Sequence, residues 1–256
     1  MLEGARNFRA VAPYPAAGGR RLKPGILYRS GELSRLGHED LAFLHGLRIR
    51  LVCDLRSRSE QQEYVSRWPD GSAHRHLELA DRDQSAASPE KLFAIVASQP
   101  GELGALKAMD LLYRRKPQAY AEQLKTLFAE ILAGDALPLL VHCHAGKDRT
   151  GFIVAMLLAA AGVARADIFA DYEMTAQFFP EETEARAIVA WAMRSYGQEI
   201  TAAAARPMVQ ARPDYLAASF EEIDRSWGGV GPYLRDAVGL EDPALERLRE
   251  LLLTEA

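Results

Sequence analysis

The chain has 256 residues, of which 48% are hydrophobic and 26% are charged. This composition is typical of a globular protein with a packed core and excludes disorder over most of the length. The formal net charge is −4. That balance excludes a general nucleic-acid coat and a polybasic membrane binder, although it allows a local basic pocket.

Two cysteines, Cys53 and Cys143, are too few for a disulfide framework and favour a reducing compartment. The longest apolar run, residues 151–164, is shorter than the ~20 residues that a membrane span requires. Residues 1–15 lack the continuous apolar stretch of a secretory signal. We therefore expect a cytoplasmic protein with neither a nucleic-acid partner nor stable membrane insertion. Export by an unusual route and the oligomeric state stay open.

Taken in chain order, the first half alternates turns, strands and a helix. Glycine and proline in residues 1–25 predict turns and short extended pieces. The pattern then predicts a strand at 26–30, a helix at 38–46 and a strand at 49–56, whose nearly continuous apolar residues suit a buried parallel strand. Residues 60–90 are polar and rich in turn-forming residues, so we expect a long connection there.

The second half is mainly helical. Residues 137–143 predict a strand, and 150–162 predict a helix that is apolar on nearly all sides and therefore buried at the centre. Helical periodicity predicts further helices at 90–99, 102–115, 117–133, 165–178, 181–196, 213–226, 230–238 and 243–254. The sequence therefore predicts one α/β domain over residues 1–256, with a helical C-terminal half.

The chemistry concentrates in Val141–Gly151, which reads VHCHAGKDRTG. A predicted buried strand ends there, a glycine-containing loop follows, and an apolar helix begins. Loop N–H groups and the helix dipole of such an arrangement attract anions. Lys147 and Arg149 add two positive charges, so the expected guest is a phosphate or another oxyanion.

Three chemistries fit a loop of this kind, and two of them fail on the residues. A nucleotide-binding P-loop fails because Asp148 follows Gly146-Lys147 and Val141 stands where the first glycine belongs. A metal site is disfavoured because three adjacent residues, His142, Cys143 and His144, cannot converge on one ion.

The third chemistry is a cysteine nucleophile, with Arg149 six positions after Cys143. A thiol beneath N–H donors and a helix N-terminus is deprotonated near neutral pH and can attack phosphorus. The N–H groups of the loop and the Arg149 guanidinium then hold the equatorial oxygens of the transferring phosphate group. A cysteinyl-phosphate forms and water hydrolyses it, with no metal or other cofactor required.

The block HCHAGKDRTG resembles the active-site loop of the cysteine-dependent protein tyrosine phosphatase superfamily. Its Gly-Lys-Asp-Arg-Thr-Gly part resembles the atypical bacterial tyrosine/serine, or dual-specificity, branch, which includes lipid-active mycobacterial members. Other segments resemble the same branch in the same order, namely Asn7-Phe8-Arg9, 25–36, 51–60 and 213–253. The resemblance implies a phosphatase-like α/β fold with a central, mostly parallel sheet flanked by helices.

The resemblance also implies the substrates and the roles of loop residues. Phosphotyrosine proteins are the default substrate, with phosphoserine/threonine proteins and phosphoinositides as alternatives. His144, Ala145 and Gly146 are expected to bind phosphate, mainly through N–H groups. Thr150 is expected either to donate its hydroxyl to the Cys143 thiolate or to cap the helix. Lys147 either adds charge at the pocket, which would suit phosphoinositides, or lies in solvent.

The general acid has three candidates. The resemblance favours Asp148, although a salt bridge to Arg149 or Lys147 is its ordinary alternative. Asp110, in a helical pattern, and Asp70, in a Trp-Pro-Asp tripeptide, are the rivals upstream of the loop.

The remaining expectations concern the surroundings of the loop. Asp54 and Arg56 follow a strand that should neighbour the nucleophile's strand, so they either orient the loop or form a surface ion pair. His142 is either a hydrogen-bonding support or a satisfied core histidine. Cys53 is expected to be a buried structural cysteine, with a protective disulfide to Cys143 as the alternative. Residues 80–115 form either a helical lid or an ordinary part of the core. A catalytically silent phosphate-binding module is the competing function, disfavoured because nucleophile, arginine and threonine are all present.

Overall fold

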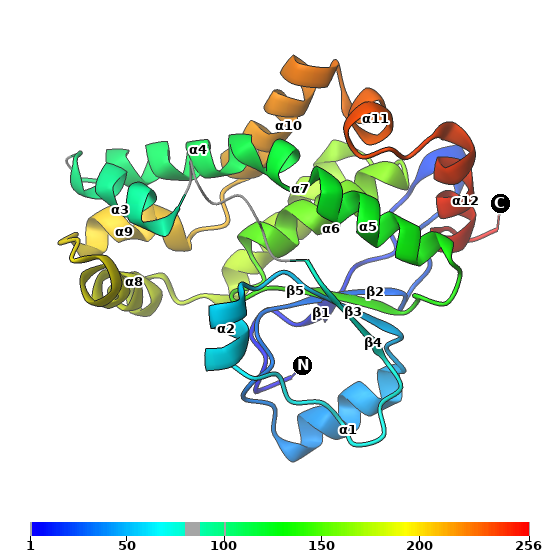
Figure 1. The fold of residues 1–256 in the computed structure, drawn as a ribbon, viewed down its shortest axis with the longest axis horizontal. Coiled ribbons are helices and arrows are strands. Elements are labelled where there is room, and N and C mark those ends of the chain that lie inside the picture. The colour runs from blue at the N-terminus through cyan, green and yellow to red at the C-terminus, as the bar shows by residue number, and fades with distance from the viewer. Residues whose placement is uncertain (1, 80–87, 100, 256) are drawn as a thin grey trace.

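Within the part of the chain that the structure describes, residues 2–79, 88–99 and 101–255, the computed structural model has a five-stranded sheet at its centre (Figure 1). The strand order is β1-β2-β5-β3-β4. The strands are β1 (Arg9–Ala10), β2 (Leu27–Ser30), β3 (Leu51–Asp54), β4 (Arg75–Glu78) and β5 (Leu139–His142). Only the pairing of β1 with β2 is antiparallel. The predicted mostly parallel sheet flanked by helices is confirmed.

The sheet is covered on both faces because its central strands are apolar on both sides. Cys53 on β3 lies opposite Val141 on β5, and both belong to the main hydrophobic cluster. Val52 and Leu140, which point the other way, pack in a smaller cluster with residues of α1 (His38–Leu47). This continuous apolar pattern is the one expected of buried parallel strands.

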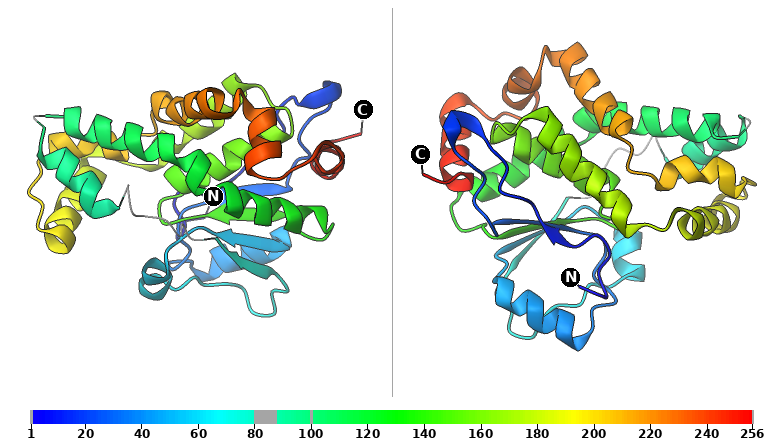
Figure 2. Two further views of the ribbon diagram at one scale, coloured as in Figure 1. Left: turned by 45° about the horizontal axis from the view of Figure 1, so that its top comes forward. Right: turned by 180° about the vertical axis from the view of Figure 1, so that it is seen from behind.

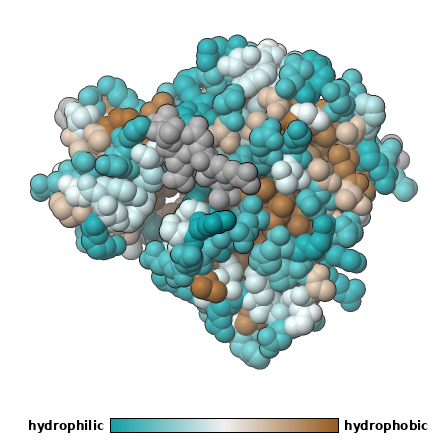
Figure 3. Space-filling view, in the orientation of Figure 1, coloured by the Kyte–Doolittle hydropathy of each residue, from teal (hydrophilic) through white to brown (hydrophobic). Residues whose placement is uncertain are grey.

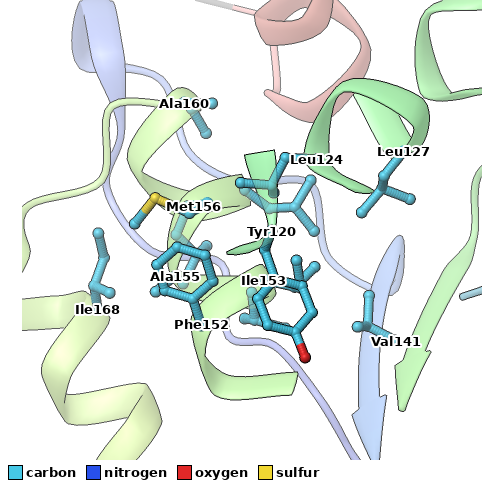
Figure 4. Close-up of a cluster of buried hydrophobic side chains, with 14 of the residues drawn as sticks. Tyr120, Leu124, Leu127, Val141, Phe152, Ile153, Ala155, Met156, Ala160 and Ile168 are labelled. Atoms are coloured by element: carbon cyan, nitrogen blue, oxygen red, sulfur yellow. The ribbon is translucent and has the colours of Figure 1, made fainter. Parts of the chain in front are cut away.

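The main cluster lies between the sheet and two helices, α5 (Ala121–Leu132) and α6 (Asp148–Ala160). Figure 4 shows Phe152, Ile153 and Met156 of α6 among side chains such as Leu124 of α5. Helix α6 is buried on nearly all sides, as its sequence predicts. A helix so enclosed holds its N-terminal residues in a fixed place relative to the end of β5.

The other helices extend the layer of α5 and α6 and form a side lobe. They are α2 (Arg58–Glu63), α3 (Pro89–Ala97), α4 (Leu103–Ala119), α7 (Arg165–Glu173), α8 (Glu181–Tyr196), α9 (Ala202–Val209), α10 (Pro213–Trp227), α11 (Val230–Pro232) and α12 (Asp242–Leu252), with short turns η1 (Ala17–Gly19), η2 (Met174–Phe178) and η3 (Tyr233–Ala237). Helices α3, α4, α8 and α9 share a separate hydrophobic cluster that includes Phe93 and Ala205. Figure 2 shows this lobe projecting to one side of the sheet.

Several predicted boundaries are wrong, and each error has a physical reason. The predicted connection at 60–90 holds most of α2 and all of β4. Helix α2 begins at a capping box between Ser57 and Glu60, and β4 is an exposed edge strand without apolar alternation. Helix α9, which the sequence analysis missed, begins where the Thr201 side chain accepts a hydrogen bond from the Ala204 N–H. Helix α4 continues to Ala119 despite Pro117.

No helix among the described residues is both long and apolar enough to cross a membrane.

Candidate active site

The predicted loop joins the carboxyl end of β5 to the first turn of α6, at the middle of the sheet. Neighbouring strands end beside it, at Ser30 of β2 and Asp54 of β3, both opposite His142. Cys143 is buried at the base of the loop, and the Gly146 N–H donates to its Sγ at 3.2 Å. A crevice at the carboxyl ends of parallel strands is where open α/β sheets bind ligands.

The loop turns its carbonyl groups outward. The His144 carbonyl accepts from the Glu32 N–H at 2.8 Å. The Gly146 carbonyl accepts from Asn7 Nδ2 at 2.7 Å and from the Arg29 Nη2 at 2.9 Å. Because a trans peptide places N–H and C=O on opposite sides, the N–H groups that follow these carbonyls, those of Ala145 and Lys147, point to the inner side. The loop is therefore a cup of amide donors.

Gly146 is required for this shape. Its φ is +69°, which favours glycine, and a Cβ there would lie 2.5 Å from the Ser30 backbone carbonyl. The strand end of β2 thus supports the loop from behind.

The Arg149 guanidinium lies at the loop, held by a carboxylate that the sequence analysis did not single out. Its Nη1 and Nη2 donate to the two Glu60 oxygens at 2.6 and 2.7 Å, and Nη1 also donates to the Leu55 carbonyl at 3.2 Å. Of its five N–H donors, these bonds use three. The remaining two, on Nε and Nη2, share one edge of the plane and have no partner among the described residues. Such an edge matches two oxygens of a phosphate.

The Glu60–Arg149 pair stays ionised across the working pH range. Burial opposes the charged form of Glu60, but the Arg149 hydrogen bonds lower the pKa of Glu60 to about 2. Burial likewise opposes the charge of Arg149, and Glu60 together with Cys143 raises the pKa of Arg149 well above its usual value. The signal that could have found Glu60 is the Ser57–Glu60 capping box, which fixes this carboxylate beside the strand end.

Asp148 is the first residue of α6, with its side chain 27% exposed. Its Oδ1 accepts a hydrogen bond of 2.7 Å from the Tyr113 hydroxyl and lies 3.5 Å from Lys147 Nζ. Part of its predicted salt bridge, the one with Lys147, is present, and its role as general acid stays a prediction.

Lys147 differs from the expectation of a charge at the pocket. Its ammonium is buried and donates to the carbonyls of Met208 and Gln210, at the end of α9. The final carbonyl groups of a helix lack helical partners and attract a cation, which explains this position. The Lys147 side chain thus links the loop to the side lobe instead of facing a ligand.

The rival acids make other contacts. Asp110 lies on α4, where it accepts hydrogen bonds of 3.0 Å from Arg114. Asp70 precedes β4, and its neighbours Pro69 and Gly71 line a surface depression with Ile49 and Arg50, at the amino end of β3. The loop lies at the carboxyl ends of the parallel strands, whereas Asp70 lies near their amino ends.

Asp54 and Arg56 form a buried ion pair beside the loop, with 2.7 Å between Arg56 Nη2 and Asp54 Oδ2. Arg56 also donates to the Tyr64 carbonyl and to Ser66, so this pair braces the segment after β3. His142 is fully buried, and burial lowers its pKa to about 4, which keeps it neutral. Neither of its ring nitrogens has a hydrogen-bond partner among the described residues.

The alternative of a disulfide between Cys53 and Cys143 does not fit the register of the strands. Both thiols are free, and burial raises the pKa of Cys53 well above its usual value. Cys53 points to the same face as Cys143 but lies opposite Val141, two residues earlier. Strand spacings place the two Cα atoms about 8 Å apart, beyond the ~7 Å limit for a disulfide without backbone movement.

Thr150 and His144 are the remaining loop residues of the prediction. Lys147 precedes the helix, so Thr150 is not the N-cap, and its buried hydroxyl has no partner among the described residues. The expected donation from Thr150 to Cys143 is therefore not made in this structure. The His144 ring contacts the Tyr64 ring edge-on, with 4.8 Å between centroids, so its side chain packs outward while its backbone belongs to the cup.

The surface opens near this end of the sheet. Figure 3 shows a hollow between the lobe of α8 and α9 and the region of α2. Of the predicted lid, residues 80–87 and 100 lie outside the described residues, α3 belongs to the side lobe, and α4 contributes to both the side lobe and the main cluster. No group of three or more His, Cys, Asp or Glu residues among those described is placed to hold a metal ion.

Comparison with known proteins decides the family. A model of the tyrosine phosphatase family matches residues 1–254. The chain belongs to the tyrosine phosphatase family. As a tyrosine phosphatase family member it is an enzyme, and the resemblance seen in its sequence is confirmed.

Named relatives of this tyrosine phosphatase family member cover most of its length. It is 36% identical over 277 residues to the triple specificity protein phosphatase PtpB of Mycobacterium tuberculosis, covering 98% of each chain. It is 28% identical to a tyrosine-protein phosphatase of Nostoc commune, covering 92% of this chain and 76% of that protein. A crystal structure of P. aeruginosa TpbA, 15% identical, covers 83% of this chain and 95% of its own, but its TM-score of 0.30 supports no further conclusion.

Proposed function

We propose that this phosphatase hydrolyses phosphotyrosine in proteins through a cysteinyl-phosphate on Cys143. The observation that carries the proposal is the pairing of an amide cup around Cys143 with the unused edge of Arg149. Amide donors and a fixed guanidinium stabilise both a thiolate and the charge that spreads over the equatorial phosphate oxygens.

The reaction has two steps in this proposal. In the first, Cys143 Sγ attacks phosphorus, the bond to the leaving oxygen breaks, and Asp148 gives that oxygen a proton. In the second, the Asp148 carboxylate takes a proton from a water molecule that attacks phosphorus, and the thiolate leaves. Arg149 and the N–H groups of residues 144–147 hold the transferring group in both steps.

The tyrosine phosphatase family of the chain and the name of the Nostoc commune relative, a tyrosine-protein phosphatase, support phosphotyrosine as the substrate. The charge argument for phosphoinositides rested on Lys147, whose ammonium is bound to α9 carbonyls. Phosphoserine/threonine proteins and phosphoinositides therefore enter as comparison substrates. A silent binding module is disfavoured because thiol, guanidinium and carboxylate lie at one loop.

The test measures turnover of p-nitrophenyl phosphate in EDTA, with and without vanadate, for the wild type and Cys143→Ser. Cys53→Ser is the matched control, since Cys53 is an equally buried cysteine on the neighbouring strand. We expect turnover that survives EDTA, is blocked by vanadate, is lost in Cys143→Ser and is retained in Cys53→Ser. A silent wild type that still binds vanadate would favour the binding module. Phosphotyrosine peptide should then be turned over faster than phosphoinositide.

A further inference from the structure

Two buried tyrosines continue inward from the candidate acid. The Tyr113 hydroxyl, on α4, lies 2.7 Å from Asp148 Oδ1 and 2.6 Å from the Tyr172 hydroxyl, on α7. A hydroxyl has one proton, and the ionised carboxylate can only accept, so Tyr113 donates to Asp148 and Tyr172 donates to Tyr113. The three groups form a single directed chain of hydrogen bonds.

The fold makes room for this chain at a specific position. Gly151 follows Asp148 by one helical turn, and a Cβ on Gly151 would lie 2.8 Å from the Tyr172 ring. The absence of a side chain there lets that ring lie against the first turn of α6. Behind it, Arg29 binds Asp171 at 2.5 Å, which fixes α7 beside the loop.

Both phenols remain donors wherever the enzyme works. Tyr113 and Tyr172 are fully buried, and burial raises the pKa of each well above its usual value. The other groups facing Asp148 are Lys147 from the loop and Tyr215 from α10. Tyr215 gives its own hydroxyl proton to the Pro207 carbonyl at 2.9 Å, so it does not join the chain.

We propose that Tyr113, supported by Tyr172, is a positioning residue that assigns the two oxygens of Asp148 different roles. Oδ1 faces the donors Tyr113 and Lys147, so a proton on Asp148 resides on Oδ2, which no described residue hydrogen-bonds. When Oδ2 gives that proton to the leaving oxygen, the Tyr113 hydrogen bond strengthens as the carboxylate forms, and the transition state gains from it. This inference rests on the proposed role of Asp148 as general acid.

The test compares two substrates whose leaving groups need protonation to different degrees. Phenyl phosphate releases a strongly basic oxygen, and p-nitrophenyl phosphate a weakly basic one. For Tyr113→Phe we expect kcat/KM to fall about tenfold more on phenyl phosphate than on p-nitrophenyl phosphate. This loss is smaller than the full effect of a general acid, because Asp148 itself is still present. The alkaline limb of the kcat/KM profile should move to higher pH, because the carboxylate loses a stabilising donor.

Two variants complete the design. Tyr172→Phe keeps the contact between Tyr113 and Asp148, so a smaller effect in the same direction is expected. Tyr215→Phe removes a neighbouring buried hydroxyl outside the chain, whose ring lies 5.7 Å from that of Tyr113, and should leave the substrate ratio and the profile unchanged. Thermal unfolding of each variant shows that it is folded.

The outcomes separate this inference from the proposed function. Equal losses of Tyr113→Phe on both substrates, with the alkaline limb unmoved, would overturn the positioning role. Asp148→Asn is measured alongside. If Asp148→Asn loses far more on phenyl phosphate while Tyr113→Phe does not, only the tyrosine inference fails. If Asp148→Asn also shows no dependence on the leaving group, the assignment of the acid fails.

Discussion

The Arg149 side chain shows how much one residue depends on geometry as well as charge. Glu60 and the Leu55 carbonyl hold one edge of the guanidinium, which leaves two parallel donors for a phosphate. A lysine keeps the charge, but its ammonium lacks the planar set of donors that binds a carboxylate and two phosphate oxygens at the same time. The positive charge and its orientation are therefore separable by mutation.

We expect Arg149→Lys to lower kcat/KM for p-nitrophenyl phosphate by about 10²–10³-fold, because the fork that stabilises the transition state is lost. Steady-state kinetics with a circular-dichroism check of folding measures this. Arg247→Lys is the control, since Arg247 forms an exposed ion pair with Glu250 within the C-terminal helix α12. Activity of Arg149→Lys within threefold of the wild type would show that the fork is not used.

Glu60→Gln tests the same contact through stability. The pKa of Glu60 in the folded protein is about 2, below the ordinary value of ~4.3, so its ionised form stabilises the fold. The stabilisation by ionised Glu60 is fully present when the pH is above the ordinary glutamate pKa, and it is lost as the pH falls toward 2. We expect urea unfolding to show a wild-type advantage of about 1–3 kcal/mol at pH 7 that shrinks between pH 5 and pH 3. An advantage that stays constant over this range would contradict the ion pair.

At the scale of the element, the loop between β5 and α6 keeps its shape through contacts with other segments rather than through contacts among its own residues. Asn7, Arg29 and the Glu32 N–H bind its carbonyl groups, and these partners come from the N-terminal segment, from β2 and from the turn after β2. The loop's shape is therefore a property of three segments brought together by the sheet.

Gly146→Ala should collapse the amide cup. The added Cβ meets the Ser30 backbone at 2.5 Å and forces a positive φ on alanine. We expect vanadate affinity to fall at least tenfold, as measured by inhibition or calorimetry. Gly197→Ala is a matched control, because Gly197 also has a positive φ but nothing within 4 Å of its Cβ position. Equal vanadate affinity in both variants would contradict the account.

The sequence predicted only those parts of the site whose residues leave a local pattern in the chain. The loop itself was predictable, because Cys143 and Arg149 have a fixed spacing between a buried strand and an apolar helix. The partners Asn7, Arg29 and Tyr113 were not, since they reach the loop through tertiary contacts that leave no spacing rule. Glu60 left only the Ser57–Glu60 capping box, which marks a helix start and does not show that Glu60 binds Arg149. The Lys147 side chain was misplaced for the same reason, because helix α9, which accepts its hydrogen bonds, was itself missed.

The fold as a whole was predictable where apolar periodicity was strong and failed where it was weak. The buried strands β3 and β5 and helix α6 carry long apolar patterns. The exposed edge strand β4 and the short helix α2 do not, so the polar stretch that holds them resembled a connection. Edge strands lack one covered face, and their sequences are correspondingly less constrained.

At the scale of the molecule, stability rests mainly on the cluster between the sheet, α5 and α6. Phe152 of α6 is fully buried beside Tyr120, with 6.0 Å between ring centroids. We expect Phe152→Ala to lower the free energy of unfolding by about 3–5 kcal/mol. Phe43→Ala removes a ring that is 48% exposed and should change it much less. Equal effects in urea unfolding would contradict this placement of the core.

The central claim is that Cys143 carries the phosphoryl group during turnover. Rapid acid quenching of the wild type during turnover of p-nitrophenyl phosphate, followed by peptide mass spectrometry, tests it directly. The account predicts a phosphorylated thiol on the peptide that contains Cys143 and an unmodified Cys53. Full activity in the Cys143→Ser variant, with no phosphorylated thiol found in the quenched wild type, would contradict it.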